Sequence, residues 1–337
     1  MHRDLIAIGA SAGGIEALQQ LLAALPADLP ASIVVVLHTS GRSGSMLPHI
    51  FGRATFLKVS HPEDGERLQN GHVYIAPPDF HMLVQGNHIR VLQGPRENLH
   101  RPAIDPLLRS AAVAAGRRVI GVVLTGMLDD GTSGLMVVKA HGGVPVVQDP
   151  ATAMFSSMPR HALEQVPDAR VLPLEQIPAE LVRLVREELP DRPEPAEHPG
   201  SLEEKETRLL ELEMPQIDND ERPGRPSGFA CPDCGGVLWE LEENGFLRFR
   251  CRVGHAFTAR HLNVEQQHAI ETALWSALRA LEESASLYKR LADRATKTQQ
   301  NQSAERFQDR AANTEQNARV LREFLVQVHQ GAEEAAD

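Results

Sequence analysis

Between residues 4 and 187, short apolar runs alternate with helix-like stretches, and this alternation constrains the fold more than any other feature of the sequence. Runs that are apolar throughout are typical of strands buried on both faces, as in a parallel sheet covered by crossover helices. The pattern therefore predicts a doubly wound α/β domain with a mostly parallel sheet. The predicted strands cover residues 5–8, 32–37, 73–75, 88–92, 119–124, 144–148 and 169–172.

The 337-residue chain is too long for one hydrophobic core, and its composition changes along its length. We assign residues 1–187 to the α/β domain. Residues 188–229 are rich in Pro and Glu, cannot bury enough apolar area to fold alone, and are predicted to be a flexible linker. A compact Cys/His segment, 230–262, and a strongly helical tail, 263–330, complete the predicted organisation.

Charge and cysteine content exclude several functions. The formal net charge of −11 argues against a nucleic-acid partner, which needs clustered basic residues. We find no apolar run long enough for a signal peptide or a membrane span, so we expect a cytoplasmic protein. All three cysteines lie between Cys231 and Cys251. Covalent chemistry in the α/β domain must therefore use a nucleophile other than a thiol.

Three polar residues follow predicted strands, where the carboxyl ends of parallel strands form a ligand-binding crevice. Ser11 lies in the glycine-rich segment 9–14 after the first strand, His38 ends the second strand, and Asp130 lies in a loop after the strand 119–124. Small neighbours around Ser11 favour a sharp strand-to-helix turn that exposes the hydroxyl. The three residues together form a candidate triad of nucleophile, base and orienting carboxylate.

Each of these residues also has a simpler interpretation. The glycine-rich turn, taken alone, is more typical of a dinucleotide-binding loop. That loop calls for an acidic residue at the end of the second strand, and His38 stands there instead. His38 alone could be a solvated strand-end histidine, and Asp130 before Gly131 could simply form a turn. The combination, rather than any one residue, favours catalysis.

Five dispersed motifs resemble the catalytic domain of CheB, the protein-glutamate methylesterase. They are residues 9–14, the strand end at His38, and residues 100–105, 124–131 and 158–160, and the resemblance covers residues 4 to about 185. It implies a carboxylic ester hydrolase that removes methyl esters from chemoreceptor glutamates in chemotaxis signalling and also deamidates selected glutamines. Its partner would be a methyl-accepting chemoreceptor.

By matching position, the resemblance makes Ser11 the nucleophile, His38 the general base and Asp130 the residue that orients the base. The backbone amide of Met127 would help to hold the oxyanion, and no metal or cofactor is needed for this reaction.

The resemblance also places His100 and Arg101 near the substrate cleft. Ala12 stands where the family commonly has Thr, so the backbone amide beside the oxyanion remains but a hydroxyl is lost. The family enzyme carries an N-terminal receiver domain, whereas this chain begins almost at the first catalytic strand. We therefore expect its regulation to differ or to be absent.

A set of metal-ligand residues follows the predicted linker: Cys231 and Cys234 in a CxxC turn, then Cys251 and His255. Four such ligands suit a tetrahedral structural zinc ion. A redox-active CxxC pair and reduced cysteines in a small core are the competing interpretations. Zinc is favoured because so short a segment needs a stabilising cross-link.

Between the two halves of this ligand set, apolar residues 237–241 and 246–250 flank Asn244-Gly245, a dipeptide that favours a tight hairpin. The sequence therefore predicts a zinc-ribbon-like module. His261 is interpreted as a surface histidine, with the alternative that it replaces His255 as a ligand.

The tail contains two apolar seams separated by the polar stretch 297–303, which predicts an antiparallel helical hairpin or coiled coil. The two seams could simply bury each other, or they could bind a receptor bundle or a second copy. A non-catalytic adaptor that recruits partners is therefore the alternative to an enzyme. The first seam contains Ile270, Leu274, Ala277, Leu281, Tyr288, Leu291 and Ala295, and the second contains Phe307, Ala311, Thr314, Ala318, Leu321, Leu325 and Val328.

Overall fold

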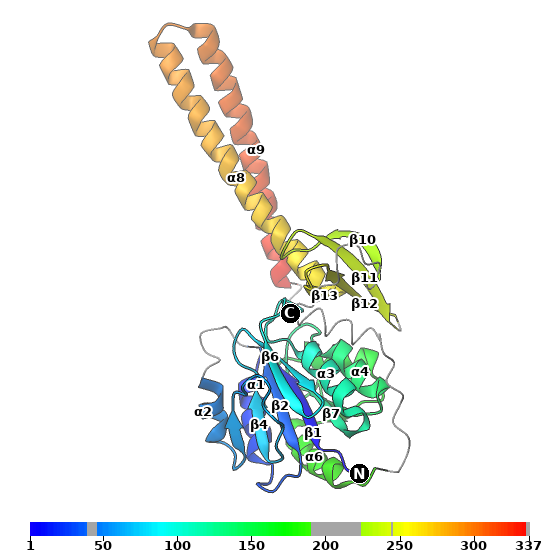
Figure 1. Cartoon of the computed structure of the whole chain (residues 1–337). Helices are drawn as coiled ribbons and strands as arrows, with labels where there is room; N and C mark the ends of the chain where they lie inside the picture. Colours follow the sequence, from blue (N-terminus) through cyan, green and yellow to red (C-terminus); the bar gives the residue numbers. More distant parts are fainter. Residues whose placement is uncertain (39–45, 190–223, 244, 335–337) are drawn as a thin grey trace. The chain divides into compact units, whose positions relative to one another are not determined.

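Seven parallel strands form the central sheet of the computed structural model, in the order β3-β4-β2-β1-β7-β8-β9 (Figure 1). The structure describes residues 1–38, 46–189, 224–243 and 245–334. The predicted doubly wound α/β fold is therefore confirmed. The strands of the sheet are β1 (Leu5–Ala10), β2 (Ser32–Leu37), β3 (Lys58–Ser60), β4 (His72–Ile75), β7 (Val119–Val123), β8 (Val144–Gln148) and β9 (Arg170–Leu172).

Helices cover both faces of this sheet, because alternate side chains of each strand point to opposite faces. Along β1, Ile6 and Ile8 contribute to one buried cluster, and Leu5 and Ala7 to the other. The helices α1 (Gly14–Ala23), α2 (Leu47–Gly52) and α6 (Ile177–Arg186) pack on the first cluster. The helices α3 (Ile104–Ala115), α4 (Thr132–Ala140) and α5 (Ser157–Gln165) pack on the second.

One predicted strand does not belong to the central sheet. Residues 88–92 form β6 (His88–Leu92), which pairs antiparallel with β5 (His81–Gln85) in a separate hairpin. Its only fully buried residue, Ile89, packs with β5 on the second cluster. Because a strand that faces the core on one side alternates in polarity, β6 differs from the uniformly apolar parallel strands. The strands β3 and β5 were not predicted, because the apolar runs within them cover only Val59 in β3 and Met82–Val84 in β5.

A four-stranded antiparallel sheet follows, in the order β10-β11-β12-β13. Its strands are β10 (Arg225–Ala230), β11 (Val237–Glu243), β12 (Phe246–Cys251) and β13 (Ala256–Thr258). Most of the predicted linker lies outside the described residues, but its last part forms β10. Residues Leu238 to Glu243 pair with Cys251 to Phe246, as the predicted hairpin requires, and Asn244 itself lies outside the described residues. We call residues 224–262 the Cys/His module.

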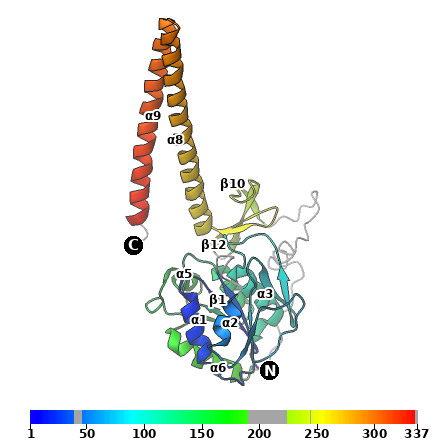
Figure 2. The same ribbon diagram turned by 90° about the vertical axis from the view of Figure 1, so that its left-hand side faces the viewer.

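Two long helices, α8 (Ala259–Lys297) and α9 (Asn301–Glu334), lie side by side in both views (Figures 1 and 2). Leu278, Ala318 and Leu325 form the buried seam between them, and Arg322 pairs with Glu282 across it. The first predicted seam is confirmed in most of its length, since Leu274 and Leu281 pack against Leu278 and Ala295 is buried, but Ile270 is 59% exposed and lies outside it. The second seam agrees with the prediction, except that the Val328 side chain lies outside the described residues.

The chain divides into two compact units, residues 1–262 and 263–337. The first contains the α/β sheet and the Cys/His module, and the second contains most of the helical pair. Within the described ranges, no helix combines the length and apolarity that a bilayer span requires.

Candidate functional site

Ser11, His38 and Asp130 meet at the carboxyl edge of the central sheet. The strand β1 lies between β2 and β7, and this is where the strand order reverses. Ser11 directly follows β1, His38 directly follows β2, and Asp130 lies in the loop between β7 and α4. In open parallel sheets, ligands bind at this kind of reversal, because the loops on either side diverge and leave a crevice.

These side chains form a continuous hydrogen-bonded chain. His38 Nδ1 lies 3.1 Å from Ser11 Oγ, and His38 Nε2 lies 2.8 Å from Asp130 Oδ2. An ionised carboxylate can only accept hydrogen bonds, so Nε2 must carry the hydrogen. Nδ1 is then left with a lone pair that accepts the hydrogen bond donated by the Ser11 hydroxyl. The imidazole is therefore in the tautomer that can remove the serine proton.

The turn that holds Ser11 is fixed by close backbone approaches. Gly13 caps α1 with φ +72°, a left-handed conformation that glycine adopts readily. A Cβ on Gly126 would lie 2.9 Å from the Ser11 Cβ, so a side chain there would displace the serine. The hydroxyl of Thr125 donates a hydrogen bond to the carbonyl of Ala12 at 3.0 Å and so joins this turn to the β7–α4 loop.

Asp130 is buried and surrounded by donors. The first amides of α3 donate to it, Ile104 N to Oδ2 at 2.7 Å and Asp105 N to Oδ1 at 3.2 Å. The amide of Asn98 donates to Oδ1 at 2.9 Å. Burial by itself raises the pKa of Asp130, but the hydrogen bond and charge of His38, together with the Ile104 and Asn98 donors, outweigh it and hold the pKa below its usual range. The carboxylate therefore stays ionised beside the imidazole.

A second buried carboxyl, Asp105, lies next to this one. Burial and the negative charge of Asp130 raise the pKa of Asp105 well above its usual range. Asn98 Nδ2 also donates to Asp105 Oδ2 at 2.9 Å, and Gly134 N donates to Oδ1. The pKa values of the two carboxyls are therefore shifted in opposite directions, and the carboxyl with the lowered pKa is the one that faces His38.

A family model described as CheB methylesterase matches residues 6–181, slightly more than half of the chain. The chain belongs to the CheB methylesterase family. The resemblance predicted from the motifs is thus confirmed, and residues 6–181 are a hydrolase domain of this family, which we call the methylesterase domain.

Several relatives support the assignment. A putative protein-glutamate methylesterase/protein-glutamine glutaminase of Leptospira interrogans is 38% identical over 193 residues, covering 57% of this chain and 100% of that protein. The protein-glutamate methylesterase/protein-glutamine glutaminase 5 of Anaeromyxobacter dehalogenans is 41% identical over 194 residues, or 54% of this chain and 51% of that protein. The chain thus spans about half the length of such longer relatives.

The crystal structure of the Thermotoga maritima CheB methylesterase catalytic domain is similar in fold. It aligns with a TM-score of 0.52 at 35% identity and covers 55% of this chain and 100% of that one. The fold and the family of the first half of the chain therefore rest on sequence and structure alike.

His100 lies flat against His38, with ring centroids 3.6 Å apart and planes 13° from parallel. Burial, and then the neighbouring His38, lower the pKa of His100 to about 3, so the ring is neutral at ordinary pH. The guanidinium of Arg101 donates to Asp79 at 2.7 Å and to the carbonyl of Gly94 at 2.7 Å. Met127 is 59% exposed. Roles of His100, Arg101, Met127 and Ala12 toward substrate stay predictions.

Cys231, Cys234, Cys251 and His255 come together in the Cys/His module, with their ligand atoms within 4.8 Å of one another. Cys234 Sγ lies 3.7 Å from Cys251 Sγ, and His255 Nδ1 lies 3.5 Å from Cys251 Sγ. Tetrahedral zinc with ordinary bond lengths of about 2.3 Å to sulfur and 2.0–2.1 Å to nitrogen separates its ligands by about 3.5–3.8 Å. The residues present therefore fit a tetrahedral metal ion.

His261 is neither at the surface nor part of this cluster, contrary to our interpretation of the sequence. It is 1% exposed, and its Nδ1 lies 2.8 Å from Asp129 Oδ1 in the methylesterase domain. The sequence around His261 gave no sign of this contact, because its partner lies more than a hundred positions earlier in the chain.

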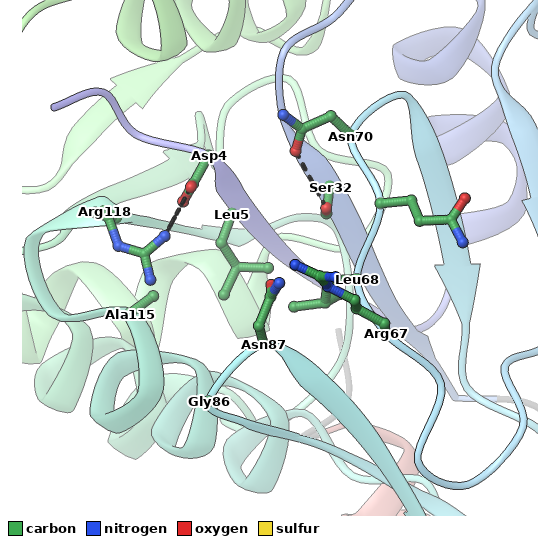
Figure 3. A pocket seen from close by; sticks show the side chains of 11 residues that line it. Asp4, Leu5, Ser32, Arg67, Leu68, Asn70, Gly86, Asn87, Ala115 and Arg118 are labelled. Atoms are coloured by element: carbon green, nitrogen blue, oxygen red, sulfur yellow. Dashed lines mark hydrogen bonds and ion pairs between the residues drawn. The ribbon is translucent and has the colours of Figure 1, made fainter.

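A cavity of about 540 Å³ lies at the opposite edge of the sheet, beside the first residues of β1 and β2 (Figure 3). It is lined by polar residues that pair with one another, such as Arg118 with Asp4 and Ser32 with Asn70. Folds of this kind bind substrates at the carboxyl-terminal ends of their parallel strands, not at the amino-terminal ends where this cavity lies. The triad, not this cavity, is therefore the candidate active site.

Sequence reasoning missed two residues at the triad. Thr125 fixes the Ser11 turn, and Asn98 joins Asp130 to Asp105. In the structure, the backbone of Asn98 has φ 51°, a left-handed conformation that Asn tolerates better than most residues. The residue type at this position is therefore the one weak signal that the sequence contained. That preference is too weak to identify one Asn in a sequence.

Proposed function

We propose that this chain is a protein-glutamate methylesterase that uses Ser11 as nucleophile, His38 as general base and Asp130 to orient the base. The observation that carries the proposal is the unbroken path from Ser11 Oγ through His38 to Asp130, with distances of 3.1 and 2.8 Å. Such a path is what nucleophilic catalysis by serine requires near neutral pH.

In the proposed reaction, His38 takes the Ser11 proton through Nδ1 as the hydroxyl oxygen attacks the ester carbonyl. The imidazolium is stabilised by the ionised Asp130, whose own charge is held by the amides at the start of α3. The tetrahedral intermediate collapses, His38 returns the proton to the leaving oxygen, and methanol departs. Water then attacks the acyl-serine with the same base and releases the glutamate carboxylate.

Backbone amides would hold the developing oxyanion. The candidates are Ala12, at the start of the turn into α1, and Met127, in the β7–α4 loop. Amides at a helix start carry partial positive charge and need no reorganisation during the reaction. Ala12 retains the amide that the mechanism needs, although it lacks a hydroxyl.

The proposed substrate is a glutamate methyl ester on a methyl-accepting chemoreceptor, with deamidation of glutamine as a second reaction. Relatives named protein-glutamate methylesterase/protein-glutamine glutaminase support this choice. An amide is attacked by the same serine, and its leaving nitrogen takes the proton that His38 holds. A cytoplasmic location fits this substrate, and the net charge of −11 supports a protein rather than a nucleic acid as partner.

The test is methanol release from methyl-esterified chemoreceptor by the intact chain and by Ser11→Ala. We expect release by the intact chain and none above background in the variant. Ser157→Ala, whose hydroxyl contacts the carbonyl of Leu128 outside the triad, is the matched control. If the intact, folded chain released no methanol but still reacted with a fluorophosphonate at Ser11, the substrate would be wrong and the hydrolase retained. If neither occurred, a non-catalytic adaptor would be the better proposal.

We also propose that Cys231, Cys234, Cys251 and His255 hold a structural zinc ion in the manner of a zinc ribbon. The ligand separations support this, and with four protein ligands no position remains for a substrate. The ion would take no part in ester hydrolysis. Atomic absorption on the purified chain should find one zinc per chain, and a zinc-free, fully folded module would contradict the proposal.

For the helical pair, we propose that α8 and α9 present a surface to a partner protein or to a second copy of the chain. Their mutual seam is already buried, so a partner would have to use outward side chains such as Trp275, which is 47% exposed, and Ile270. Sedimentation of the intact chain and of Ile270→Ser distinguishes self-association from a solvated hairpin.

A further inference from the structure

The Cys/His module pairs with a loop of the methylesterase domain through backbone hydrogen bonds. Asn98 N donates to the carbonyl of Ala256 at 2.8 Å, and Ala256 N donates to the carbonyl of Arg96 at 3.2 Å. These bonds join the loop to β13, the edge strand of the module's sheet. We call residues 96–100 the Asn98 loop; it also carries His100, which stacks on His38.

A chain of side-chain hydrogen bonds continues from this contact to the triad. Thr258 N, in β13, donates to Asn98 Oδ1 at 2.9 Å. The other end of the same amide, Nδ2, donates to Asp130 Oδ1 at 2.9 Å. Asn98 is only 1% exposed, so water cannot readily replace either bond. One buried amide therefore separates the module's backbone from the carboxylate that orients His38.

A second contact reaches the residue next to Asp130. The Thr258 hydroxyl donates to Asp129 Oδ1 at 2.7 Å, and Asp129 is 2% exposed. A third contact is ionic: Arg250, in β12, lies 3.0 Å from Glu97, which also forms a bidentate pair with Arg109 on α3. All three charged groups are buried. Removing the module would leave Glu97 paired with Arg109 but would take one arginine out of this buried ionic network, which makes the contact costly to break.

Two residues of the Cys/His cluster are close in sequence to the residues that make these contacts. Cys251 ends β12, and His255 directly precedes β13, so two of the four ligands hold the ends of the strands that contact the methylesterase domain. The module's own core is small, with six buried residues of which two are ligands. A core of this size rarely holds a sheet without a cross-link.

We propose that the Cys/His module is a working part of the hydrolase: Thr258 is a positioning residue for Asp130, acting through Asn98 and Asp129, and metal bound at the cluster sets the catalytic rate. The inference rests on the proposed triad and metal site. When the cluster is filled, β13 is held in place and Asn98 keeps both of its bonds. When it is emptied, β13 loosens, Asn98 loses its Thr258 donor, and Asp130 orients His38 less well.

The first experiment changes the Thr258 hydroxyl in the full, metal-loaded chain. Thr258→Val keeps the backbone N–H that donates to Asn98 and removes the hydroxyl that donates to Asp129. We expect it to lower kcat about tenfold, with KM within about twofold. Thr258→Ser should restore kcat. Thr296→Val is the matched control, because the Thr296 hydroxyl donates to the carbonyl of Ala292 within α8, far along the helix from this contact.

The Thr258 hydroxyl also accepts a hydrogen bond from His261 N at 3.2 Å and so caps the start of α8. This capping role is purely structural, and the experiment must distinguish it from the positioning of Asp130. Thr258→Asp keeps a capping acceptor but places a negative charge against Asp129. We expect this variant to lose kcat as well. Normal kcat in either Thr258→Val or Thr258→Asp, or an equal loss in Thr296→Val, would overturn positioning through Asp129; the bond from Thr258 N to Asn98 is tested by emptying the cluster.

The second experiment empties the cluster. All three cysteines of the chain are cluster ligands, so an organomercurial with a chelator acts on thiols nowhere else. We expect the rate of fluorophosphonate labelling at Ser11 to fall about tenfold and to recover after excess thiol and zinc are added. An unchanged rate would make the module an independent attachment, and a faster rate would make it an inhibitor; either result overturns the proposal.

Hydrogen exchange provides a measure that does not depend on activity. Emptying the cluster should accelerate exchange of amides in residues 96–105, which include the donors to Asp130, and leave β1 unchanged. If the intact chain fails to react at Ser11, the proposed function fails and this exchange still decides the coupling. Equal protection of residues 96–105 with and without metal would contradict it.

Discussion

The methylesterase domain and the Cys/His module are held together by different means. The domain buries two large apolar clusters, one on each face of its sheet. The apolar cluster of the module contains six buried residues, including Cys231 and Cys251. Burial of apolar area on this scale is enough to stabilise a domain, whereas a cluster as small as that of the module is not, so we expect the module to depend on metal bound at its Cys/His cluster and on its contacts with the Asn98 loop. The difference predicts that loss of metal will affect the module most and that loss of core packing will affect the domain most.

The sequence offers separate probes for the two regions. Its two tryptophans are Trp239 in β11 and Trp275 in α8, so neither lies in the methylesterase domain. Tryptophan fluorescence of a Trp275→Phe chain therefore reports on the module, and Ser11 reactivity reports on the domain. The predictions below use this separation.

Replacing a metal ligand should have the largest effect. We expect Cys251→Ser to abolish zinc binding and to unfold the module, since structural zinc contributes about 10–16 kcal/mol to small zinc-dependent folds. The methylesterase domain should keep its own unfolding transition. The measurements are zinc content and Trp239 fluorescence. Val253→Ala, at a 41% exposed position in the same turn, is the control and should keep its zinc.

Removing the charge of Asp130 should affect catalysis and spare the module. We expect Asp130→Asn to lower kcat by about 10³–10⁴-fold, because an amide at that position favours the wrong imidazole tautomer. Zinc content and Trp239 fluorescence should not change. Asp4→Asn removes a carboxylate at the opposite edge of the sheet, where it pairs with Arg118, and should keep kcat. A fully active Asp130→Asn would remove Asp130 from the mechanism.

Packing of the methylesterase domain comes next in size. Leu18, on α1, is fully buried, whereas Ile15 on the same helix is 37% exposed. We expect Leu18→Ala to lower the free energy of unfolding of the domain by about 3 kcal/mol, and Ile15→Ala by less than about 1 kcal/mol. Urea unfolding followed by far-ultraviolet circular dichroism tests this. Zinc binding should persist in both variants. Its loss in Leu18→Ala would contradict the prediction that packing of the domain and metal binding by the module are independent.

The features of each region that could be predicted from the sequence are those that depend on local pattern. The strands β1, β2 and β8 were predictable because uniformly apolar runs have one stable environment, between two layers of helices. The triad was predictable because parallel strands end at a common edge, so residues 11, 38 and 130 had to converge. The meeting of Cys231 and Cys234 was predictable from spacing, because a CxxC turn brings two thiols together locally, and the hairpin between Cys234 and Cys251 brings the other two residues of the cluster near them. Metal binding by the four residues stays a prediction.

The contact between the two regions could not be predicted. Asn98, Thr258 and His261 carry no local pattern, and their partners lie far away in the sequence. A buried His261 and a surface His261 look the same in one sequence, because burial of a polar residue depends on a partner that another segment supplies. Residues 88–92 were predicted as a strand, but not the antiparallel pairing of β6 with β5, because nothing local in the sequence identifies the partner of a strand.

The smallest expected effect concerns Asp105. Its contribution to stability changes with pH in the opposite direction to that of Asp130. Because the pKa of Asp105 is raised in the folded chain, this carboxyl favours folding at and below its ordinary pKa of 3.8, and that contribution is lost as pH rises toward the folded value. The lowered pKa of Asp130 gives stability above its ordinary value that is lost as pH falls. Asp105→Asn keeps an acceptor for Gly134 N and cannot ionise.

We therefore expect the stability of Asp105→Asn to rise relative to that of the unsubstituted chain between pH 5 and pH 7, by at most about 1.4 kcal/mol per pH unit, because only the unsubstituted chain releases the Asp105 proton when it unfolds. Asp168→Asn, at a surface pair with Lys139, should show no comparable gain because exposed pairs contribute little. Urea unfolding of the methylesterase domain at the two pH values measures the difference. If the variant and the unsubstituted chain differed in stability by the same amount at pH 5 and pH 7, Asp105 would ionise as freely as a surface carboxyl. The negative charge near His38 would then be shared by Asp105 and Asp130 rather than held by Asp130.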